Sequence, residues 1–409
     1  CAAHDAGTPY CDREANLCVE CIQPSDCGSL ANICDPDTHT CVECVADLDC
    51  DMETEPACNP ETKACGCTEH SDCPDTACEL DVGTCFPAEL TAVLHARASV
   101  DPMCADKPCD AGEPCCSVDA AFMKATLTGK EYIVIRVEPP LAPGPTDPGL
   151  TIDPTANGKR IAILGAGMPV LESDAGNLPL VFLSAAAKVY LAGLRLRAKT
   201  TDTAFACLGG TGAWVDDVLV DDLPNGVAFF AGKCPLTIRR AVVRNVGGGV
   251  HIGADGVGRI ADTIIAAPSD FALRAELGGT LDAVFSTVFE RTGADGRLLQ
   301  CADPAAKITA RNSILVSDPE LGSSACAGAE VSTSVVTADA LVGPTVAAVD
   351  PAELDKLFLD LAGGDLHIKP GAAVFNNVAA REVGDPLTDV DRQPRPLGAG
   401  ALDWAGADR

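Results

Sequence analysis

Short runs in which apolar and polar residues alternate fill most of the chain after residue 88. Residues 189–194, 236–241 and 308–313 are examples, rich in Val, Ile, Leu and Ala. An alternation with a period of two is typical of a strand with one buried face. None of the runs carries an apolar stripe at the 3.6-residue spacing of a helix, so the pattern predicts short strands throughout this region.

The runs also recur at a nearly constant interval. The fifth position of most runs is a small or polar residue of the kind found where a chain bends, and it serves to align them. These positions, 22 to 26 residues apart, are Gly193, Asp217, Arg240, Asp262, Ser286, Asn312 and Ser334. A period near 23 residues indicates a solenoid, and strands at this period predict an all-β fold, a right-handed parallel β-helix. Leucine-rich repeats have a similar period, but their leucine ladder and asparagine are missing.

We expect the β-helix to occupy residues 129–409 and to end in a C-terminal cap. Its first coils should start at 132–137, 149–153 and 160–164. Residues 88–128 form a lead-in, in which Ser117 caps a short helix. Because an open end of a solenoid invites pairing with another chain, we expect this helix to cover the N-terminal end. Its apolar face comprises Val118, Phe122 and Ala125, and the cysteines expected to staple the lead-in are Cys104, Cys109, Cys115 and Cys116.

Residues 1–87 follow a different pattern, in which cysteines repeat in place of apolar residues. A unit with the spacing Cys-x2-Cys-x5-Cys begins at Cys18 and at Cys41, and a shortened form begins at Cys65. Units of 20 to 24 residues bury too little apolar surface to fold unaided, so disulfides are expected to replace a core. We therefore expect a disulfide-rich spacer whose pairing the spacing leaves open. Its repeat cysteines are Cys11, Cys18, Cys21, Cys27, Cys34, Cys41, Cys44, Cys50, Cys58, Cys65, Cys67, Cys73, Cys78 and Cys85.

A zinc ribbon is the alternative explanation of this spacing. The pairs Cys18/Cys21 and Cys41/Cys44 match the ligand spacing of tetrahedral zinc sites. Further cysteines lie between the pairs, however, and the third unit contracts to Cys65-Gly66-Cys67, which breaks the metal-binding knuckle. Structural disulfides are the favoured interpretation, and no metal site is expected.

The remaining cysteines support an exported protein. Cys207 and Cys234 are 27 residues apart and Cys301 and Cys326 are 25 apart, about one coil each, so both pairs are predicted to be bonded between stacked coils. Cysteines at this density indicate an oxidising compartment. The total of 23 is odd, and Cys1 is the residue expected to lack a partner.

Cys1 resembles the lipid-modified N-terminal cysteine of bacterial lipoproteins. The resemblance implies a protein held by lipid at the cell surface or outer membrane. A free thiol at an arbitrary starting point of the sequence is the alternative.

The formal net charge of -30 excludes some classes of partner. Acidic residues strongly outnumber basic ones, above all in residues 1–87, so nucleic acid and anionic headgroups are repelled. Scattered carboxylates in the spacer are expected to bind calcium weakly at most, because no ordered twelve-residue calcium loop is present. No other cofactor is expected. No apolar stretch approaches the ~18 residues of a membrane-spanning helix.

Two parts of the chain resemble known families. Residues 129–137, 150–153 and 159–167 resemble the entry coils of the pectin-lyase-like β-helix superfamily. The tail at 364–375, 389–396 and 400–404 resembles the C-terminal signature of the bacterial surface β-helix proteins known as choice-of-anchor Q proteins, although its closing run, residues 403–406, differs from the usual one. His367 falls within this signature, and we expect it to be structural.

Polysaccharide cleavage is the activity that such a resemblance suggests. Lyases need a base and hydrolases need paired carboxylates, and the candidate residues are Asp216, Asp217, Asp221, Asp222 and His251. Neighbouring residues of a strand point to opposite faces, so each aspartate doublet offers one carboxylate per surface. The ordered motif set of the hydrolase family is not reproduced. Two Trp and three Tyr in the whole chain leave few platforms for stacking on sugars.

The hypothesis that fits these patterns is a non-catalytic cell-surface lipoprotein that acts as an adhesin, a surface-structure component or a glycan-contact module. Its expected partner is a cell-surface polysaccharide or a surface protein. A secreted polysaccharide lyase or glycoside hydrolase is the first alternative. A self-assembling extracellular filament is the second, because solenoid ends can stack.

Overall fold

The computed structural model describes residues 10–12, 17–28, 33–98, 107–139, 149–173, 179–198, 203–266, 268–290, 297–317, 324–337 and 346–408. The chain divides into two compact units, Cys1–Thr91 and Ala92–Arg409. The predicted boundaries lay after residues 87 and 128. Cys1 and Cys104 lie outside the described residues, so the predicted lipid anchor and one predicted staple stay predictions.

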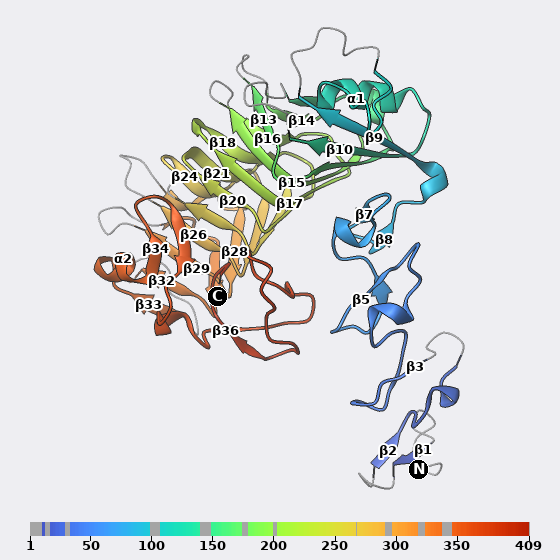
Figure 1. Cartoon of the computed structure of the whole chain (residues 1–409). Coiled ribbons are helices and arrows are strands. Elements are labelled where there is room, and N and C mark those ends of the chain that lie inside the picture. Colours follow the sequence, from blue (N-terminus) through green and yellow to red (C-terminus); the bar gives the residue numbers. More distant parts are fainter. Residues whose placement is uncertain are drawn as a thin grey trace. The chain divides into compact units, whose positions relative to one another are not determined.

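Three repeats of the first unit share one architecture (Figure 1). Each has a one-turn 3₁₀ helix followed by a two-stranded antiparallel hairpin. Each repeat has four cysteines, beginning at Cys21, Cys44 and Cys67, and the first bonds to the third and the second to the fourth, a pairing that the spacing left open. The disulfides are Cys21–Cys34, Cys27–Cys41, Cys44–Cys58, Cys50–Cys65, Cys67–Cys78 and Cys73–Cys85. The elements are η1 (Pro24–Asp26), β3 (Ile33–Cys34), β4 (Cys41–Val42), η2 (Asp47–Asp49), β5 (Ala57–Cys58), β6 (Cys65–Gly66), η3 (His70–Asp72), β7 (Cys78–Glu79) and β8 (Thr84–Cys85), preceded by the hairpin of β1 (Tyr10–Asp12) and β2 (Leu17–Val19).

Cysteine and aspartate side chains stabilise these repeats. The buried cluster of the third repeat consists of its four cysteines, with Leu80 packed against them. Asp26 accepts the backbone N–H groups of Ile22 and Gln23 at 2.9 and 3.1 Å, and Asp49 and Asp72 occupy the same place in the next two repeats. These repeats are therefore held by cross-links and turn hydrogen bonds, as expected for units too small for an apolar core.

The second unit is a parallel β-solenoid of about seven turns, so the predicted all-β solenoid fold is confirmed. Three parallel sheets run along it. The first contains β10 (Tyr132–Glu138), β12 (Arg160–Gly165), the leading parts of β15 (Lys188–Ala198) and β17 (Gly212–Asp221), β19 (Leu236–Arg239), β22 (Val257–Ala261), β25 (Thr280–Val284), β28 (Lys307–Arg311) and β31 (Ala329–Ser332).

The second sheet follows the first after a sharp corner in each coil. It contains β13 (Val170–Ser173), the trailing parts of β15 and β17, β20 (Val242–Arg244), β23 (Ile264–Ala266), β26 (Thr287–Glu290), β29 (Ile314–Ser317), β32 (Val335–Thr337) and β33 (Ala347–Val349). The third sheet contains β11 (Leu150–Ile152), β14 (Val181–Leu183), β16 (Thr203–Cys207), β18 (Leu223–Ala231), β21 (Val246–Ile252), β24 (Phe271–Ala275), β27 (Arg297–Cys301) and β30 (Ser324–Ala325).

The corner between the first two sheets is a single residue in the left-handed backbone region. The corner residues, with φ between +44° and +66°, are Gly193, Asp217, Arg240, Asp262, Phe285, Asn312 and Thr333. Strand pairing places Asp217, Arg240 and Asp262 directly over one another, as the alignment of the runs predicted. A one-residue corner explains why glycine, aspartate and asparagine recur there, since these residues tolerate positive φ.

Two of the predicted corner positions are wrong by one residue. Ser286 and Ser334 follow the true corners Phe285 and Thr333, and both serines are fully buried. Each Oγ donates to the carbonyl two residues earlier, at 3.1 Å for Ser286 and 2.6 Å for Ser334. The small polar side chain therefore satisfies an inward-facing hydrogen bond at these positions and does not mark the bend.

A second correction concerns the first coils. Residues 149–153 do not start a coil, because β11 (Leu150–Ile152) pairs with β14 in the third sheet. It completes the coil that starts with β10, and β12 starts the next one. The strand is short and follows a long connection, so its alternation resembled the beginning of a run.

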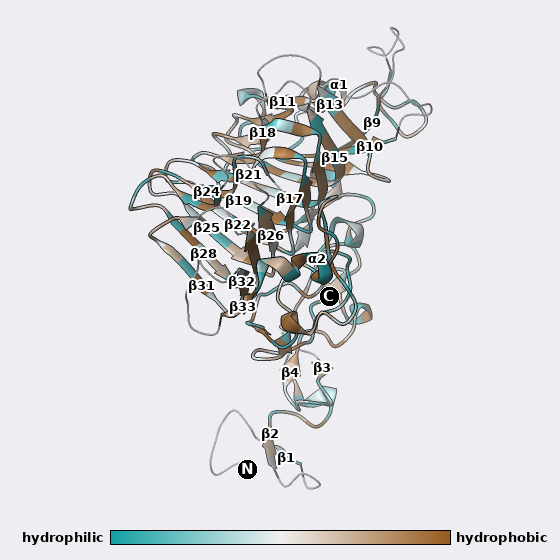
Figure 2. Cartoon of the chain, turned by 90° about the vertical axis from the view of Figure 1, so that its left-hand side faces the viewer, coloured by the Kyte–Doolittle hydropathy of each residue, from teal (hydrophilic) through white to brown (hydrophobic). Residues whose placement is uncertain are grey.

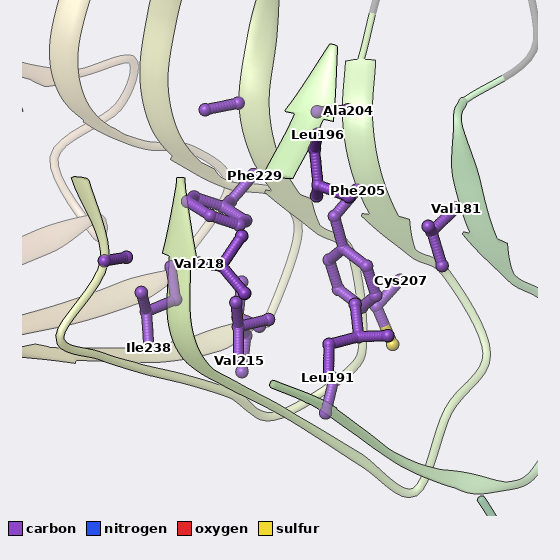
Figure 3. Packing of buried hydrophobic residues seen from close by; sticks show 14 of the residues in the cluster. Val181, Leu191, Leu196, Ala204, Phe205, Cys207, Val215, Val218, Phe229 and Ile238 are labelled. Atoms are coloured by element: carbon purple, nitrogen blue, oxygen red, sulfur yellow. The ribbon is translucent and has the colours of Figure 1, made fainter. Parts of the chain in front are cut away.

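The interior of the coil is apolar and closely packed. Leu191, Val215 and Ile238 point inward from the first sheet towards Phe205 and Phe229 of the third (Figure 3). Strands such as β10 and β15 accordingly carry long apolar stretches (Figure 2). Among the described cysteines of this unit, Cys207–Cys234 and Cys301–Cys326 join successive coils, and Cys109–Cys115 closes a short loop before the first coil. Cys116 is also disulfide-bonded.

Helix α1 (Val118–Thr126) lies beside the first coil. Ser117 caps it by accepting the N–H of Ala120 at 3.0 Å, as the sequence predicts. Its buried face joins the same apolar cluster as β10 and β11, and consists of Val118, Ala121, Phe122 and Ala125. The helix thus covers apolar side chains at the N-terminal end of the solenoid. Strand β9 (Thr91–Arg97) precedes it.

The C-terminal tail packs along the side of the solenoid, although we expected it to form a cap. A second apolar cluster joins outward residues of the second sheet, such as Ile264, Phe289 and Ile314, to Phe358 and Phe375 of the tail. The lower strands of this sheet are therefore buried on both faces. The tail contains η7 (Pro351–Glu353), α2 (Leu354–Leu357), β34 (Phe358–Asp360), β35 (Asp365–Ile368), η8 (Ala373–Phe375), β36 (Ala379–Ala380) and β37 (Leu402–Asp403). In the part of the chain that the structure covers, no helix is long and apolar enough to cross a membrane.

Candidate functional site

The first aspartate doublet is divided between two sets of contacts. Asp216 is buried, and its Oδ2 accepts hydrogen bonds from Arg239 at 2.7 Å and Arg240 at 2.6 Å. Asp217 occupies the left-handed corner, is partly exposed, and forms an ion pair with Arg392 of the tail at 3.1 Å. The two carboxylates therefore do not form a pair on one surface.

The second doublet belongs to a cluster of arginines on the outer face of the second sheet. Asp221 is 5% exposed, and both its oxygens accept from Arg195, with a separation of 3.0 Å between Nε and Oδ1. Arg197 donates to Asp221 at 3.3 Å, and its Nη2 lies 3.0 Å from Asp222. The Asp221 hydrogen bond raises the pKa of Arg195, so this guanidinium is firmly charged.

A pocket of about 460 Å³ opens over this cluster. One wall comes from the solenoid and the other from the tip of the tail hairpin formed by β34 and β35. The residues that line it are Arg195, Arg197, Asp221, Asp222, Arg244, Asn245, Ala266, Ala362, Gly363 and Gly364. Asn245 donates to Asp222 at 3.0 Å. The pocket is polar and lies in the size range of roughly 300–1,000 Å³ that is usual for small-molecule sites.

Glycine at position 364 allows the close approach of the two walls. Gly364 has φ of +77°, and a Cβ there would lie 3.3 Å from the Cβ of Ala266 and 3.7 Å from the Cβ of Arg244. A larger residue would be strained in its backbone and would press on the solenoid wall. The hairpin tip is thus built to lie against the second sheet.

His251 lies elsewhere, on the outer face of the third sheet. Its ring makes edge contacts with Phe230 and Phe271, with centroid separations of 4.9 and 5.8 Å, and Nε2 is 3.3 Å from Glu276. Burial and the nearby Arg274 lower the pKa of His251, against the opposing effect of Glu276. The structure therefore places the imidazole and the aspartates on different sheets, and the five candidate catalytic residues do not gather in one site.

Buried charges join the tail to the solenoid. Arg395 is 1% exposed and donates to Asp262 at 2.8 Å and to Asp403 at 3.0 Å, with its guanidinium 4.2 Å from the centre of the Phe285 ring. Burial raises the pKa of Asp262 to about 7, even though Arg395 acts in the opposite direction. These residues are a structural junction between the tail and the column of stacked corner residues, the corner stack.

His367 takes part in a second group of tail contacts. Its Nδ1 lies 2.5 Å from Asp365 and its Nε2 lies 3.5 Å from Asp391. Burial alone would lower the pKa of His367, but the hydrogen bond to Asp365 and the charges of Asp408, Asp391 and Asp365 raise it. These contacts are consistent with the structural role we expected for His367.

Metal ligation is limited by the state of the cysteines. Among the described residues, the groups of three or more potential metal ligands are Cys21/Cys27/Cys41, Cys44/Cys50/Cys65 and Cys67/Cys73/Cys85. All of these sulfurs are in disulfides, and so is Cys18 of the zinc alternative. They therefore offer no free thiolate to an ion. The expectation of no cofactor and of weak calcium binding at most stays a prediction.

Sequence reasoning identified the aspartates of this cluster but not its arginines. Arg195 and Arg197 stand at alternate positions of one strand, and Arg244 follows two coils later in the column of Arg197. The alternation Leu194-Arg195-Leu196-Arg197 indicates that both arginines lie on one face of a strand. To locate the site from it, the register between neighbouring coils is also needed, and the spacing of the runs did not fix that register.

Comparison with known proteins informs the first unit only. Residues 1–91 match the model of a family of unknown function (DUF8331), and these are the residues of the first compact unit. No curated protein and no solved structure matches the chain. The match assigns no activity.

Proposed function

We propose that this protein is an exported, non-catalytic recognition module of a bacterial cell surface. The solenoid carries the recognition surface, and the disulfide repeats serve as its spacer. The disulfides themselves indicate an extracellular or otherwise oxidising environment. The ligand class that we propose is a surface glycan.

The observation that carries this proposal is the arginine-lined pocket over Asp221. A hydrolase that uses paired carboxylates needs one carboxyl able to give a proton and another able to act as base or nucleophile. Asp221 instead accepts hydrogen bonds from two guanidinium groups, and Asp222 is engaged by Arg197 and Asn245. Such an arrangement favours binding, since charged and polar groups are fixed in place around an open pocket.

The solenoid class belongs to the proposal as well. We assign it to right-handed β-helices of the pectin-lyase-like kind with a choice-of-anchor Q type tail. The three parallel sheets, to which successive coils contribute their strands, support this assignment. The tail motif also has defined structural contacts: Asp389 accepts the N–H groups of Asp391 and Gln393, and Arg395 enters the buried junction with Asp262.

A glycan screen with a parallel activity assay tests the proposal. The full chain is applied to immobilised neutral and acidic polysaccharides, and the same polysaccharides in solution are assayed for new reducing ends and unsaturated products. We expect retention on at least one glycan and no product. If products form with the wild-type chain and not with Asp221→Asn, the protein is an enzyme and the proposal is wrong. Retention on no glycan would remove the glycan-binding role.

A further inference from the structure

One column of outward-facing residues changes from charged to apolar along the second sheet. In the upper coils it contains Glu172, Arg197 and Asp221, which are paired in register. Arg244 stands at the equivalent place in the next coil and pairs with Ala266, after which the column continues with Phe289 and Val316. The tail covers the apolar part of this column. The pocket lies at the change, with Ala266 on its floor and Gly363 and Gly364 beside it.

The charged part of the column would be expected to neutralise itself if it were purely structural. Asp221 meets that expectation for Arg195 and Arg197, from which it accepts three hydrogen bonds. Arg244 is different. Its side chain is 43% exposed, its Nη2 lies 3.7 Å from Asp221, and its charge also acts on Asp365 of the tail. Within the described residues, no side-chain hydrogen bond from its guanidinium is formed.

The pocket therefore holds a guanidinium group with open hydrogen-bonding capacity. Three arginines and two aspartates line it, and the carboxylates of Glu172 and Asp365 also act on its arginines. The feature that favours an anion is therefore the open guanidinium and not a net positive charge. The planar fork of arginine matches the two oxygens of a carboxylate, which is the geometry that gives arginine its preference for oxyanions. Asp222, Asn245 and the backbone of residues 362–364 add polar groups at the rim that suit hydroxyls.

The charge of the whole chain limits the ligand further. A polyanion brings many charges close to a strongly acidic protein and is repelled over distances comparable with the Debye length, about 8–10 Å at moderate salt. A ligand with one oxyanion gains the local contact without this cost. An apolar ligand would leave the guanidinium and carboxylate groups without water or partners.

We propose that this pocket binds a singly charged acidic sugar, with the sugar carboxylate on Arg244 and its hydroxyls on Asp222, Asn245 and the hairpin backbone. The inference rests on the proposed glycan-binding function and adds to it the position of the site and the charge of its ligand. Arg195 and Arg197 act as positioning residues, since their hydrogen bonds fix the Asp221 carboxylate beside Arg244.

Titration calorimetry on the full chain tests the inference with three probes: glucuronate, glucose and inorganic phosphate. We expect glucuronate to bind at least ten-fold more tightly than the neutral sugar or the free anion. Arg244→Met is expected to weaken glucuronate binding by about 10- to 100-fold, because one charge-assisted contact is lost. Arg244→Lys keeps the charge without the fork and should fall between the two.

Arg297→Met is the matched control, because it removes one exposed positive charge from the third sheet, away from the pocket. It should leave the affinity for glucuronate unchanged. Phosphate binding as tight as glucuronate would reduce the site to a simple anion site and overturn the inference. Equal affinities of wild type and Arg244→Met would overturn it as well.

The two proposals fail in different ways. If the screen retains the full chain on a glycan and Arg244→Met is retained equally, the glycan-binding function stands and this position of the site is wrong. If neither protein is retained and glucuronate does not bind, both are wrong. We expect Arg244→Met to unfold at the same temperature as the wild type, because the side chain is exposed. Unchanged thermal unfolding would exclude misfolding as the cause of any loss of binding.

Discussion

At the residue scale, the solenoid and its tail are joined by side chains at the corners of the coils. Asn312 occupies a left-handed corner, and its side chain both donates to the carbonyl and accepts the N–H of Ala380 in the tail, at 3.0 and 3.1 Å. Arg395 reaches back from the tail to Asp262, another corner. The residues that tolerate positive φ are thus also the ones that hold the tail, so the corner stack has two structural roles.

Replacing Arg395 by methionine tests the buried junction. Removal of the guanidinium leaves Asp262 and Asp403 buried without their cation, and breaking such a pair typically costs about 3–5 kcal/mol. Urea unfolding is followed by the fluorescence of Trp404 in a Trp214→Phe background, in which it is the remaining tryptophan. Arg392→Ala is the control: its pair with Asp217 is exposed, so a loss below about 1 kcal/mol is expected. Equal losses in the two variants would contradict the junction.

The tail is also expected to respond to pH. The folded pKa of Asp262 is raised to about 7 from 3.8, and that of His367 is raised above 6.5. A raised folded pKa means that the folded state binds the proton more tightly, so the contribution of each group to stability falls as pH rises, between about 4 and 7 for Asp262 and above 6.5 for His367. The urea midpoint reported by Trp404 should therefore decrease from pH 5.5 to pH 8.5.

His367→Gln separates the two contributions. It should flatten the upper part of this pH profile, and Asp262→Asn should flatten the lower part. A midpoint that rises with pH in the wild-type protein would show that the assigned directions of the two pKa shifts are wrong.

At the scale of elements, strand type and coil period were predictable from the sequence, because burial on one face imposes the period-two pattern that the runs display. The corner at 285 was not, because phenylalanine takes the left-handed position and the neighbouring Ser286 has the composition of a turn. The packing of the tail was also missed. Its signal was the unbroken apolar run at Ile264–Ala266 and in Ile314–Ser317, since strands buried on both faces lose their alternation.

The inter-coil disulfides belong to this scale. Cys207–Cys234 closes a loop of 27 residues, and by the loop-closure relation its removal should cost about 3.5 kcal/mol through the entropy of the unfolded chain. The double variant Cys207→Ala with Cys234→Ala is compared with the equivalent variant of Cys301–Cys326, whose loop of 25 residues predicts a similar loss. Urea unfolding followed by the fluorescence of Trp214 in a Trp404→Phe background measures both. A loss near zero for the first pair would mean that native packing alone fixes these coils.

At the scale of the whole molecule, two units are stabilised by different means. The solenoid buries a continuous apolar cluster that runs from α1 to the last coils, whereas the cysteine repeats contain little besides their own disulfides. This division was predictable from composition. The candidate site was not, because its arginines come from coils that are two apart and its second wall comes from a tail more than 100 residues later. Only the register of the coils and the packing of the tail bring those residues together.

Hydrogen exchange of the full chain before and after reduction with a phosphine measures this division most directly. Reduction removes the cross-links that substitute for a core in residues 17–85, so their amides should exchange at rates close to those of an unfolded chain. Amides of the solenoid strands from β15 to β29 should keep their protection, because stacked apolar coils hold them without the disulfides. Loss of protection in both units together, or protection that persists in the reduced repeats, would contradict the account.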